Sequence, residues 1–363
     1  MKKIILFLFP FLIILALVPL LYFQFSACGI SPLSCGDYTT KGTPITQKIM
    51  VGNGPEDMAL DYSNKTPRII VSCDERREDQ PDIGVFYSID LADNTSTPLQ
   101  IIPANFEIHP HGIDVVNMDS ITYLYAISHD GKGFNTSHRI VRFRINGDTL
   151  LLDENTIFQD ALMTGPNDLD VLEDGSFYVS NPLPSNDPME STKSILGIKN
   201  GNVLHYDGQG NWSVAVEGMC YPNGVWVNQE KGYLLVANGG CKEVGRYAIK
   251  DGKVLAKDKL STKYHSIDIP IGDNLLMDDN GVLWTAAHPC PLKFLDHAKD
   301  PSAHSPMQVF AMDPMTLKTN LVFQNNGDLI SAASTVLHWE NRLYISQVFD
   351  PFVLVVEEVS SLK

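Results

Sequence analysis

The sequence predicts an all-β fold, a six-bladed β-propeller preceded by an N-terminal hydrophobic segment. Two observations predict it: one short motif recurs six times, and each copy continues through a turn into a second apolar strand. The copies begin at Glu56, His111, Asn167, Asn223, Asp273 and Ala333, so successive copies start 55, 56, 56, 50 and 60 residues apart. Antiparallel units that repeat every fifty to sixty residues are typical of a propeller with one unit per blade.

Each unit predicts two strands and the turn between them. Alternating apolar residues predict first strands near 58–60, 113–115, 169–171, 225–227, 275–277 and 335–337. Asn, Asp and Gly then cluster at 62–65, 117–120, 173–176, 229–232, 279–281 and 340–341, which favours hairpin turns. Continuous apolar runs predict return strands at 69–72, 124–127, 177–180, 234–237, 283–286 and 343–346.

The repeat is not interrupted by a linker rich in Gly, Ser or Pro. Closed all-β folds often reach this length as one domain. We therefore expect a signal or anchor segment at 1–27, a connecting segment at 28–50 and one propeller at 51–363.

The net charge argues against a nucleic-acid partner. Asp and Glu number 43 against 27 Lys and Arg, a formal net charge of −16, and no basic stripe stands out. A small molecule is the more natural ligand of such a propeller.

The N-terminus predicts export. Lys2 and Lys3 precede an almost unbroken apolar run from Ile4 to Phe23, which is long enough to span a bilayer. An uncleaved membrane anchor therefore competes with a cleaved signal peptide, and the body is membrane-anchored or secreted. A bacterial lipoprotein attached at Cys28 is an alternative, because small residues precede that cysteine, although Phe25 stands where such signals prefer Leu.

Sequons and cysteines agree with an exported protein. The triplets at Asn64, Asn94, Asn135 and Asn211 fit glycosylation sites, and most of them fall in or near turns. None of the six cysteines forms a CxxC pair, so disulfides are expected for some of them rather than a zinc site. The sequence leaves their pairing open.

The first residues of the units predict a metal site. Equivalent positions of the blades lie on a ring around the channel of a propeller. This ring carries Glu56, Asn167, Asn223 and Asp273, and Asn274 adds a fifth side-chain oxygen. Carboxylate and amide oxygens without thiolates are the ligands that Ca²⁺ prefers, and the formal charge of this set balances a divalent cation.

A second cation is expected next to the first. Asp57 and Asp168 directly follow two of the ring residues, so in a strand their side chains point the other way, toward the interior of the channel. Two unpaired carboxylates buried there would be unfavourable. The sequence thus predicts two Ca²⁺ ions per chain.

Histidines near this ring are candidates for acid–base chemistry. His111 belongs to the ring, and His129 ends the return strand of the same unit, so both are expected on the face that carries the metal. A neutral imidazole can deprotonate water near pH 7, and a second one can relay the proton. His288 ends the return strand of the fifth unit and is a candidate for substrate contact.

These motifs resemble the paraoxonase family of calcium-dependent lactonases and arylesterases. The resemblance runs from about Gly52 to Val355 and rests on Gly54-Pro55-Glu56-Asp57, Pro110-His111-Gly112-Ile113, Ser128-His129-Asp130, Pro166-Asn167-Asp168, Pro222-Asn223-Gly224, Gly272-Asp273-Asn274 and Ala287-His288-Pro289. It implies a catalytic calcium on Glu56, Asn167, Asn223, Asp273 and Asn274. It also implies a buried calcium on Asp57, Asp168 and the carbonyl of Ile113, and a catalytic pair of His111 and His129.

Two positions depart from the family. Pro182 and Leu183 stand where animal paraoxonases carry an Asp-His pair in the active-site wall, and the last strand, 352–355, has no cysteine, so closure of the ring must rest on strand pairing. The sequence predicts a calcium-dependent hydrolase of lactones and aryl esters. The alternatives are a sugar lactonase of the gluconolactonase type and a non-catalytic binding propeller stabilised by calcium.

Overall fold

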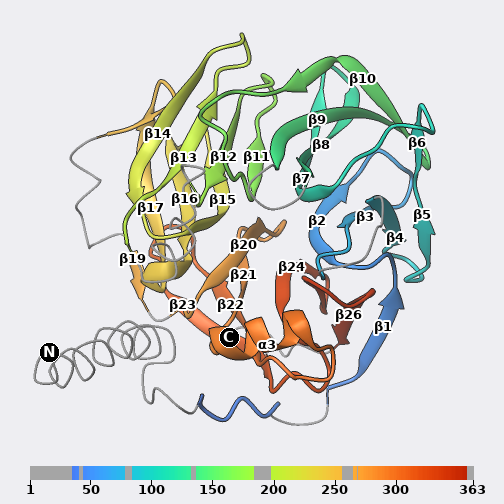
Figure 1. The fold of residues 1–363 in the computed structure, drawn as a ribbon, viewed down its shortest axis with the longest axis vertical. Coiled ribbons are helices and arrows are strands. Elements are labelled where there is room, and N and C mark those ends of the chain that lie inside the picture. Colours follow the sequence, from blue (N-terminus) through green and yellow to red (C-terminus); the bar gives the residue numbers. More distant parts are fainter. Residues whose placement is uncertain are drawn as a thin grey trace, which may run out of the picture.

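The computed structural model describes residues 35–40, 44–77, 84–131, 136–183, 198–255, 265–267 and 269–357. In this part of the chain six β-sheets surround a central axis (Figure 1). The predicted six-bladed propeller is confirmed, and each repeat supplies the inner two strands of one blade.

The blades follow one another in chain order, and each runs from its innermost strand outward, except that one outer strand of blades 2 and 6 comes earlier in the chain. Blade 1 contains β2 (Pro55–Asp61), β3 (Arg68–Cys73), β4 (Val85–Asp90) and β5 (Ser96–Pro98). Blade 2 contains β7 (Pro110–Met118), β8 (Ile121–Asp130), β9 (Ser137–Asn146), β10 (Thr149–Phe158) and the edge strand β6 (Gln100–Ile102). Blade 3 contains β11 (Leu169–Val171), β12 (Phe177–Asn181), β13 (Gly201–Tyr206) and β14 (Trp212–Met219).

The other three blades repeat this plan. Blade 4 contains β15 (Pro222–Asn228), β16 (Tyr233–Asn238), β17 (Glu243–Lys250) and β18 (Lys253–Val254), with β19 (His265–Ile267) paired to β17 and the short helix η2 (Gly239–Cys241) between β16 and β17. Blade 5 contains β20 (Gly272–Met277), β21 (Leu283–Ala287), β22 (Met307–Met312) and β23 (Thr319–Asn325), with helix α3 (Pro291–Lys299) between β21 and β22. Blade 6 contains β24 (Ala333–Trp339), β25 (Arg342–Gln347), β26 (Phe352–Glu357) and β1 (Thr46–Met50).

The ring closes where the start of the described propeller meets its end. Strand β1 pairs antiparallel with β26, from Thr46 opposite Val356 to Met50 opposite Phe352 (Figure 1). Closure by strand pairing is therefore confirmed, but two details of the expectation are corrected. The propeller begins at Thr46 rather than after residue 50, and a Cys35–Cys290 disulfide additionally ties the segment before β1 to the start of α3.

The apolar core lies between neighbouring blades. For example, Phe86 of blade 1 meets Phe143 of blade 2 with ring centroids 5.9 Å apart, and Trp284 of blade 5 shares a buried cluster with Ile345 of blade 6. Apolar side chains on both faces of each sheet are used in these contacts. The inner edges of the sheets are thus left to polar side chains that face the channel.

A register shift at the start of the inner strand turns the ring residues toward this channel. The pairing of the inner strand with its neighbour is interrupted between Pro55 and Asp57, and at the equivalent place in blades 2, 4, 5 and 6. A bulge of this kind re-aims side chains that a regular strand would alternate. It explains how the consecutive residues Asp273 and Asn274 are both buried at the site.

Two glycines allow adjacent blades to approach at this level. A Cβ on Gly112 would lie 2.4 Å from the carbonyl oxygen of Asn167, and one on Gly224 would lie 2.4 Å from the nitrogen of Leu275. Both contacts are with the backbone of the next blade, which cannot move aside without opening the ring.

We expect Gly224→Ala to destabilise the protein by about 1–3 kcal/mol, the usual range for overpacking. The change forces Asn274 and Leu275 away from blade 4, and denaturant unfolding measures the loss. Gly36→Ala is a suitable control, because a Cβ there has its nearest neighbour at 3.5 Å. Equal unfolding midpoints for the two variants would contradict this account of the glycine.

The expectation of disulfides is confirmed by two bonds, Cys35–Cys290 and Cys220–Cys241, whereas the buried Cys73 is free. The expected N-terminal anchor, the alternative at Cys28 and the sequon at Asn135 lie outside the described residues. Within the described ranges, no helix is long and apolar enough to cross a membrane.

Candidate active site

The ring residues meet at the floor of a cavity of about 280 Å³ at one end of the channel. Its polar wall consists of Glu56, His111, Asn167, Asn223, Asp273 and His288. Its apolar wall includes Leu183, Tyr221, Ile271, Phe294, Leu295 and Val348. Leu183 occupies one of the positions where the sequence departs from the paraoxonase pattern, and Phe294 and Leu295 belong to α3.

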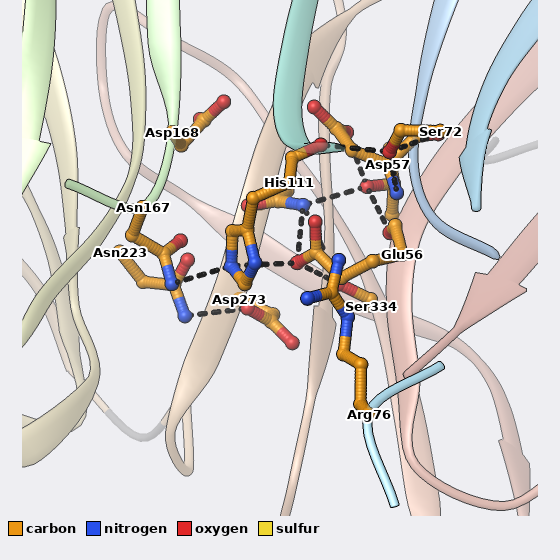
Figure 2. Close-up of polar contacts among 12 residues, drawn as sticks. Glu56, Asp57, Ser72, Arg76, His111, Asn167, Asp168, Asn223, Asp273 and Ser334 are labelled. Carbon is orange, nitrogen blue, oxygen red and sulfur yellow. Dashed lines mark hydrogen bonds and ion pairs between the residues drawn. The ribbon is translucent and has the colours of Figure 1, made fainter. Parts of the chain in front are cut away.

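Hydrogen bonds connect the ring residues across the blades. Figure 2 shows His111 between Asn167 and Glu56, with its Nε2 atom 3.1 Å from Asn167 Nδ2 and 3.7 Å from Glu56 Oε1. Asn223 Nδ2 donates to Asp273 Oδ1 at 2.5 Å, and Asn274 Nδ2 donates to Glu56 Oε1 at 3.1 Å. The five residues expected to hold the first calcium therefore come together from blades 1, 3, 4 and 5.

Four of these five residues carry a buried oxygen without a partner. Glu56 Oε2, Asn167 Oδ1, Asn223 Oδ1 and Asn274 Oδ1 accept no hydrogen bond from any described residue. An unsatisfied buried acceptor is unfavourable and rare, so four in one place require an explanation. Because each amide uses its nitrogen as a donor to a neighbour or toward His111, its oxygen is left free, as a hard cation requires.

The burial of several carboxylates also favours a bound cation. Burial, assisted by Asp57, raises the pKa of Glu56 to about 8, and burial raises the pKa of Asp57 to about 6. Burial and the Asp57 charge also raise the pKa of Asp168 well above its ordinary value. These carboxylates are in a place that disfavours negative charge, and a divalent cation would offset that penalty.

The residue types also fit calcium rather than a transition metal. Among the described residues, no three His, Cys, Asp or Glu side chains are grouped as ligands of one ion, so a site here depends on amide oxygens as well. The candidate set has three amides and two carboxylates, which are oxygen donors suited to Ca²⁺.

Asp57 and Asp168 have partners that the sequence did not indicate. Asp57 accepts hydrogen bonds from the backbone nitrogen of Ile113 at 2.7 Å and from Thr335 Oγ1 at 2.6 Å. Asp168 accepts one from the backbone nitrogen of Val225 at 2.8 Å. The expectation that these two carboxylates are unpaired is therefore wrong: each latches the inner strand of its blade to that of the next blade. The hypothesis of a second calcium at this place is therefore supported by the charge of the two carboxylates and not by unsatisfied oxygens.

The predicted histidine pair lies together, and a third imidazole extends it. The rings of His111 and His129 make a T-shaped contact with centroids 4.8 Å apart. His129 Nδ1 is in turn 2.7 Å from Nδ1 of His138, a residue that the sequence analysis left without a role. Burial lowers the pKa of His111 and of His129 well below the ordinary value, so both imidazoles are neutral at pH 7.

His288 reaches the cavity as expected, but it also contacts a candidate metal ligand. Its Nε2 atom is 2.9 Å from Asp273 Oδ2, and its ring packs against Phe294 of α3 at 4.7 Å. The imidazole therefore holds the Asp273 carboxylate in place beneath the apolar wall.

Besides His138, three residues at the site could not be identified from the sequence. Ser334 Oγ donates to Glu56 Oε1 at 2.9 Å, so blade 6 contributes through the residues that follow the degenerate Ala333. Thr335 Oγ1 also bonds to Asp57, and Arg76 brings a positive charge close enough to favour the ionised form of Glu56. The polar Ser-Thr pair in the otherwise apolar sixth copy was the available signal, whereas nothing in the repeat indicated Arg76.

Part of the chain is similar to known proteins. A family model described as Arylesterase matches residues 79–354. Human serum paraoxonase/lactonase 3 is 24% identical over 248 residues, which cover 66% of each chain. The rabbit (Oryctolagus cuniculus) protein of the same name is 22% identical over 279 residues, which cover 75% of each chain. The matched part thus spans about two thirds to three quarters of these relatives.

Solved structures share the fold at low sequence identity. A gluconolactonase from Xanthomonas campestris superposes with a TM-score of 0.54 at 16% identity, covering 88% of this chain and 91% of the other. A PQQ-bound aldose sugar dehydrogenase from Streptomyces coelicolor gives a TM-score of 0.51 at 14% identity, covering 88% and 99%. Enzymes with different chemistry share this propeller, so the fold by itself does not assign the activity.

The family match is more specific than the shared fold. It begins between β3 and β4 of blade 1 and ends in β26, and within it lie both histidines of the predicted pair and four of the five residues of the candidate calcium ring. This chain belongs to the arylesterase family.

Proposed function

We propose that the protein is a calcium-dependent hydrolase of lactones and of aryl esters. The observation that carries the proposal is the set of four unpartnered buried oxygens, three of them on residues that line the cavity, beside a neutral imidazole. Membership of the arylesterase family supports the same reaction class.

The residues of the ring would hold the calcium, and the bound ion would supply Lewis-acid polarisation of the carbonyl and stabilisation of the developing oxyanion. His111 is placed to take a proton from water, because its imidazole is neutral and lines the cavity beside the candidate calcium ligands. The water oxygen bonds to the carbonyl carbon, and the ester C–O bond breaks as the leaving oxygen takes up a proton. Asn167 and Glu56 hold the imidazole in position through contacts with its Nε2 atom.

The apolar wall favours substrates with a hydrocarbon portion. Leu183, Phe294 and Leu295 face the cavity opposite the polar floor. A sugar lactone would bury several hydroxyl groups against these side chains without partners, which is unfavourable. We therefore favour lactones with an acyl or alkyl chain over sugar lactones, the alternative suggested by gluconolactonases.

The test is a hydrolysis assay with a long-acyl lactone, gluconolactone and phenyl acetate, each with excess chelator and after calcium is restored. We expect the long-acyl lactone to have the highest kcat/KM, with turnover lost in chelator and recovered with calcium. Turnover that persists in chelator would refute the calcium mechanism. Calcium binding without turnover of any substrate would favour the non-catalytic binding propeller.

We also propose that the body is exported. The disulfides Cys35–Cys290 and Cys220–Cys241 fit an oxidising compartment. The apolar run from Ile4 to Phe23 precedes Cys35 closely, so it would hold the propeller near a membrane if it is not cleaved.

A further inference from the structure

His111, His129 and His138 form a row of three imidazoles in blade 2, and the predicted catalytic pair uses only the first two. We propose that His138 is the proton outlet of the active site, through which protons collected at His111 pass by way of His129 to the surface. The proposal rests on the hydrolytic function proposed above.

The row follows the order of the strands in the sheet. His111 lies on β7, the innermost strand, His129 on β8 and His138 on β9, and His129 and His138 are directly opposite each other in the register. Directly opposed residues place their side chains side by side on one face of the sheet. The three rings therefore lead away from the channel, with centroids 4.8 Å apart at both steps.

The environment changes along the row from the cavity to the surface. His111 lines the active-site cavity, and His138 lines a separate hollow of about 470 Å³ together with Gln159, Asp160 and Thr164. His138 is only partly buried, so water in the hollow can reach it. The row thus joins an internal cavity to an independent opening in blade 2.

The contact between the outer pair is suited to proton transfer. The two Nδ1 atoms of His129 and His138 are 2.7 Å apart, so one donates to the other and the pair shares a proton between them. His138 also has a hydrogen bond with the backbone of Thr164, which lines the outer hollow. His111 and His129 lie edge to face without a hydrogen bond, so transfer between them takes a bridging water.

The reaction itself requires an outlet. Hydrolysis of a lactone adds the elements of water and gives a hydroxy acid, which is a hydroxycarboxylate and one proton at neutral pH. That proton leaves the site once per turnover. Asp130, which ends β8, is engaged by Arg139 at 2.6 Å and by Ser128 at 2.7 Å, so it does not compete as the acceptor.

The test compares His138→Gln and His138→Ala with the parent, using the lactone that the parent hydrolyses. In dilute buffer without imidazole we expect kcat to fall roughly tenfold in both variants, less than for loss of the general base itself. KM and the calcium-dependent shift in Tm should stay at parental values. Added imidazole should restore kcat of His138→Ala in a saturable manner, because it can occupy the hollow and carry the proton.

His205→Gln serves as the matched control. His205 is partly buried on β13 of the next blade, packs against Tyr178 and touches neither cavity. This variant should keep parental kcat and show no response to imidazole.

Three outcomes would overturn the proposal. Parental kcat in His138→Gln at low buffer concentration would show that no relay passes through this residue. A loss that imidazole does not restore, accompanied by a change in KM or Tm, would assign His138 a positioning role only. If the parent hydrolyses no lactone or ester, the proposed function fails and the relay fails with it, whereas an active parent with unaffected variants refutes the relay alone.

Discussion

Glu56→Gln is expected to remove the stabilisation that a calcium ion bound at the ring gives to the protein, while leaving the metal-free protein at least as stable as the parent. The glutamine oxygen can keep the hydrogen bonds from Asn274 and Ser334, but its amide nitrogen replaces the unpartnered Oε2 and cannot bind a cation. Burying a neutral amide is less unfavourable than burying a carboxylate beside Asp57 and Asp273. Relative to the parent, the variant is therefore expected to be less stable when calcium is present and at least as stable when calcium is removed.

Thermal unfolding with chelator and with calcium measures both effects. A ligand that binds only the native parent raises its free energy of unfolding by about 2.7 kcal/mol at a hundred times Kd, and this increment should disappear in the variant. Glu230→Gln, in the exposed turn after β15, is the matched control and should keep the full increment. A variant that retained the calcium-dependent shift would refute the role of Glu56 as a ligand.

The repeat explains why so much of the site could be predicted from the sequence. A polar residue at a fixed place in a regular unit must lie at a fixed place in every blade, so periodicity alone brought Glu56, Asn167, Asn223 and Asp273 to one ring. The structure places these four residues together, and it also brings His111 next to His129. No local signal was needed beyond the spacing.

What remained hidden depends on pairing between strands. The bulge that turns Asp273 and Asn274 toward the same site arises from a register shift between β20 and β21, and no single residue of the sequence indicates that shift. His138 joins the site only because it lies opposite His129 across two strands, and the sequence does not fix that register. Likewise, Cys35 pairs with Cys290 across 255 residues, and no repeat relates those two positions.

The other large effect expected is on turnover. His111→Gln should keep the fold and the calcium-dependent stability but lower kcat on the preferred lactone by roughly a hundredfold or more, the usual scale of a lost general base. A glutamine can still contact Asn167 and Glu56, yet it cannot take a proton from water. Steady-state kinetics at saturating calcium, together with the unfolding measurement, separate the two effects, and His205→Gln should behave as the parent.

His288 is an alternative general base, and the kinetic experiment must distinguish it from His111. His288 also lines the cavity, and its Nδ1 atom is likewise buried without a described partner. Its other nitrogen, however, contacts Asp273 Oδ2 at 2.9 Å, so His288→Gln should weaken calcium binding as well as turnover. His111→Gln should lower turnover alone. If His111→Gln keeps parental turnover with its calcium bound, while His288→Gln loses turnover even at saturating calcium, the base is His288 and the assignment to His111 is wrong.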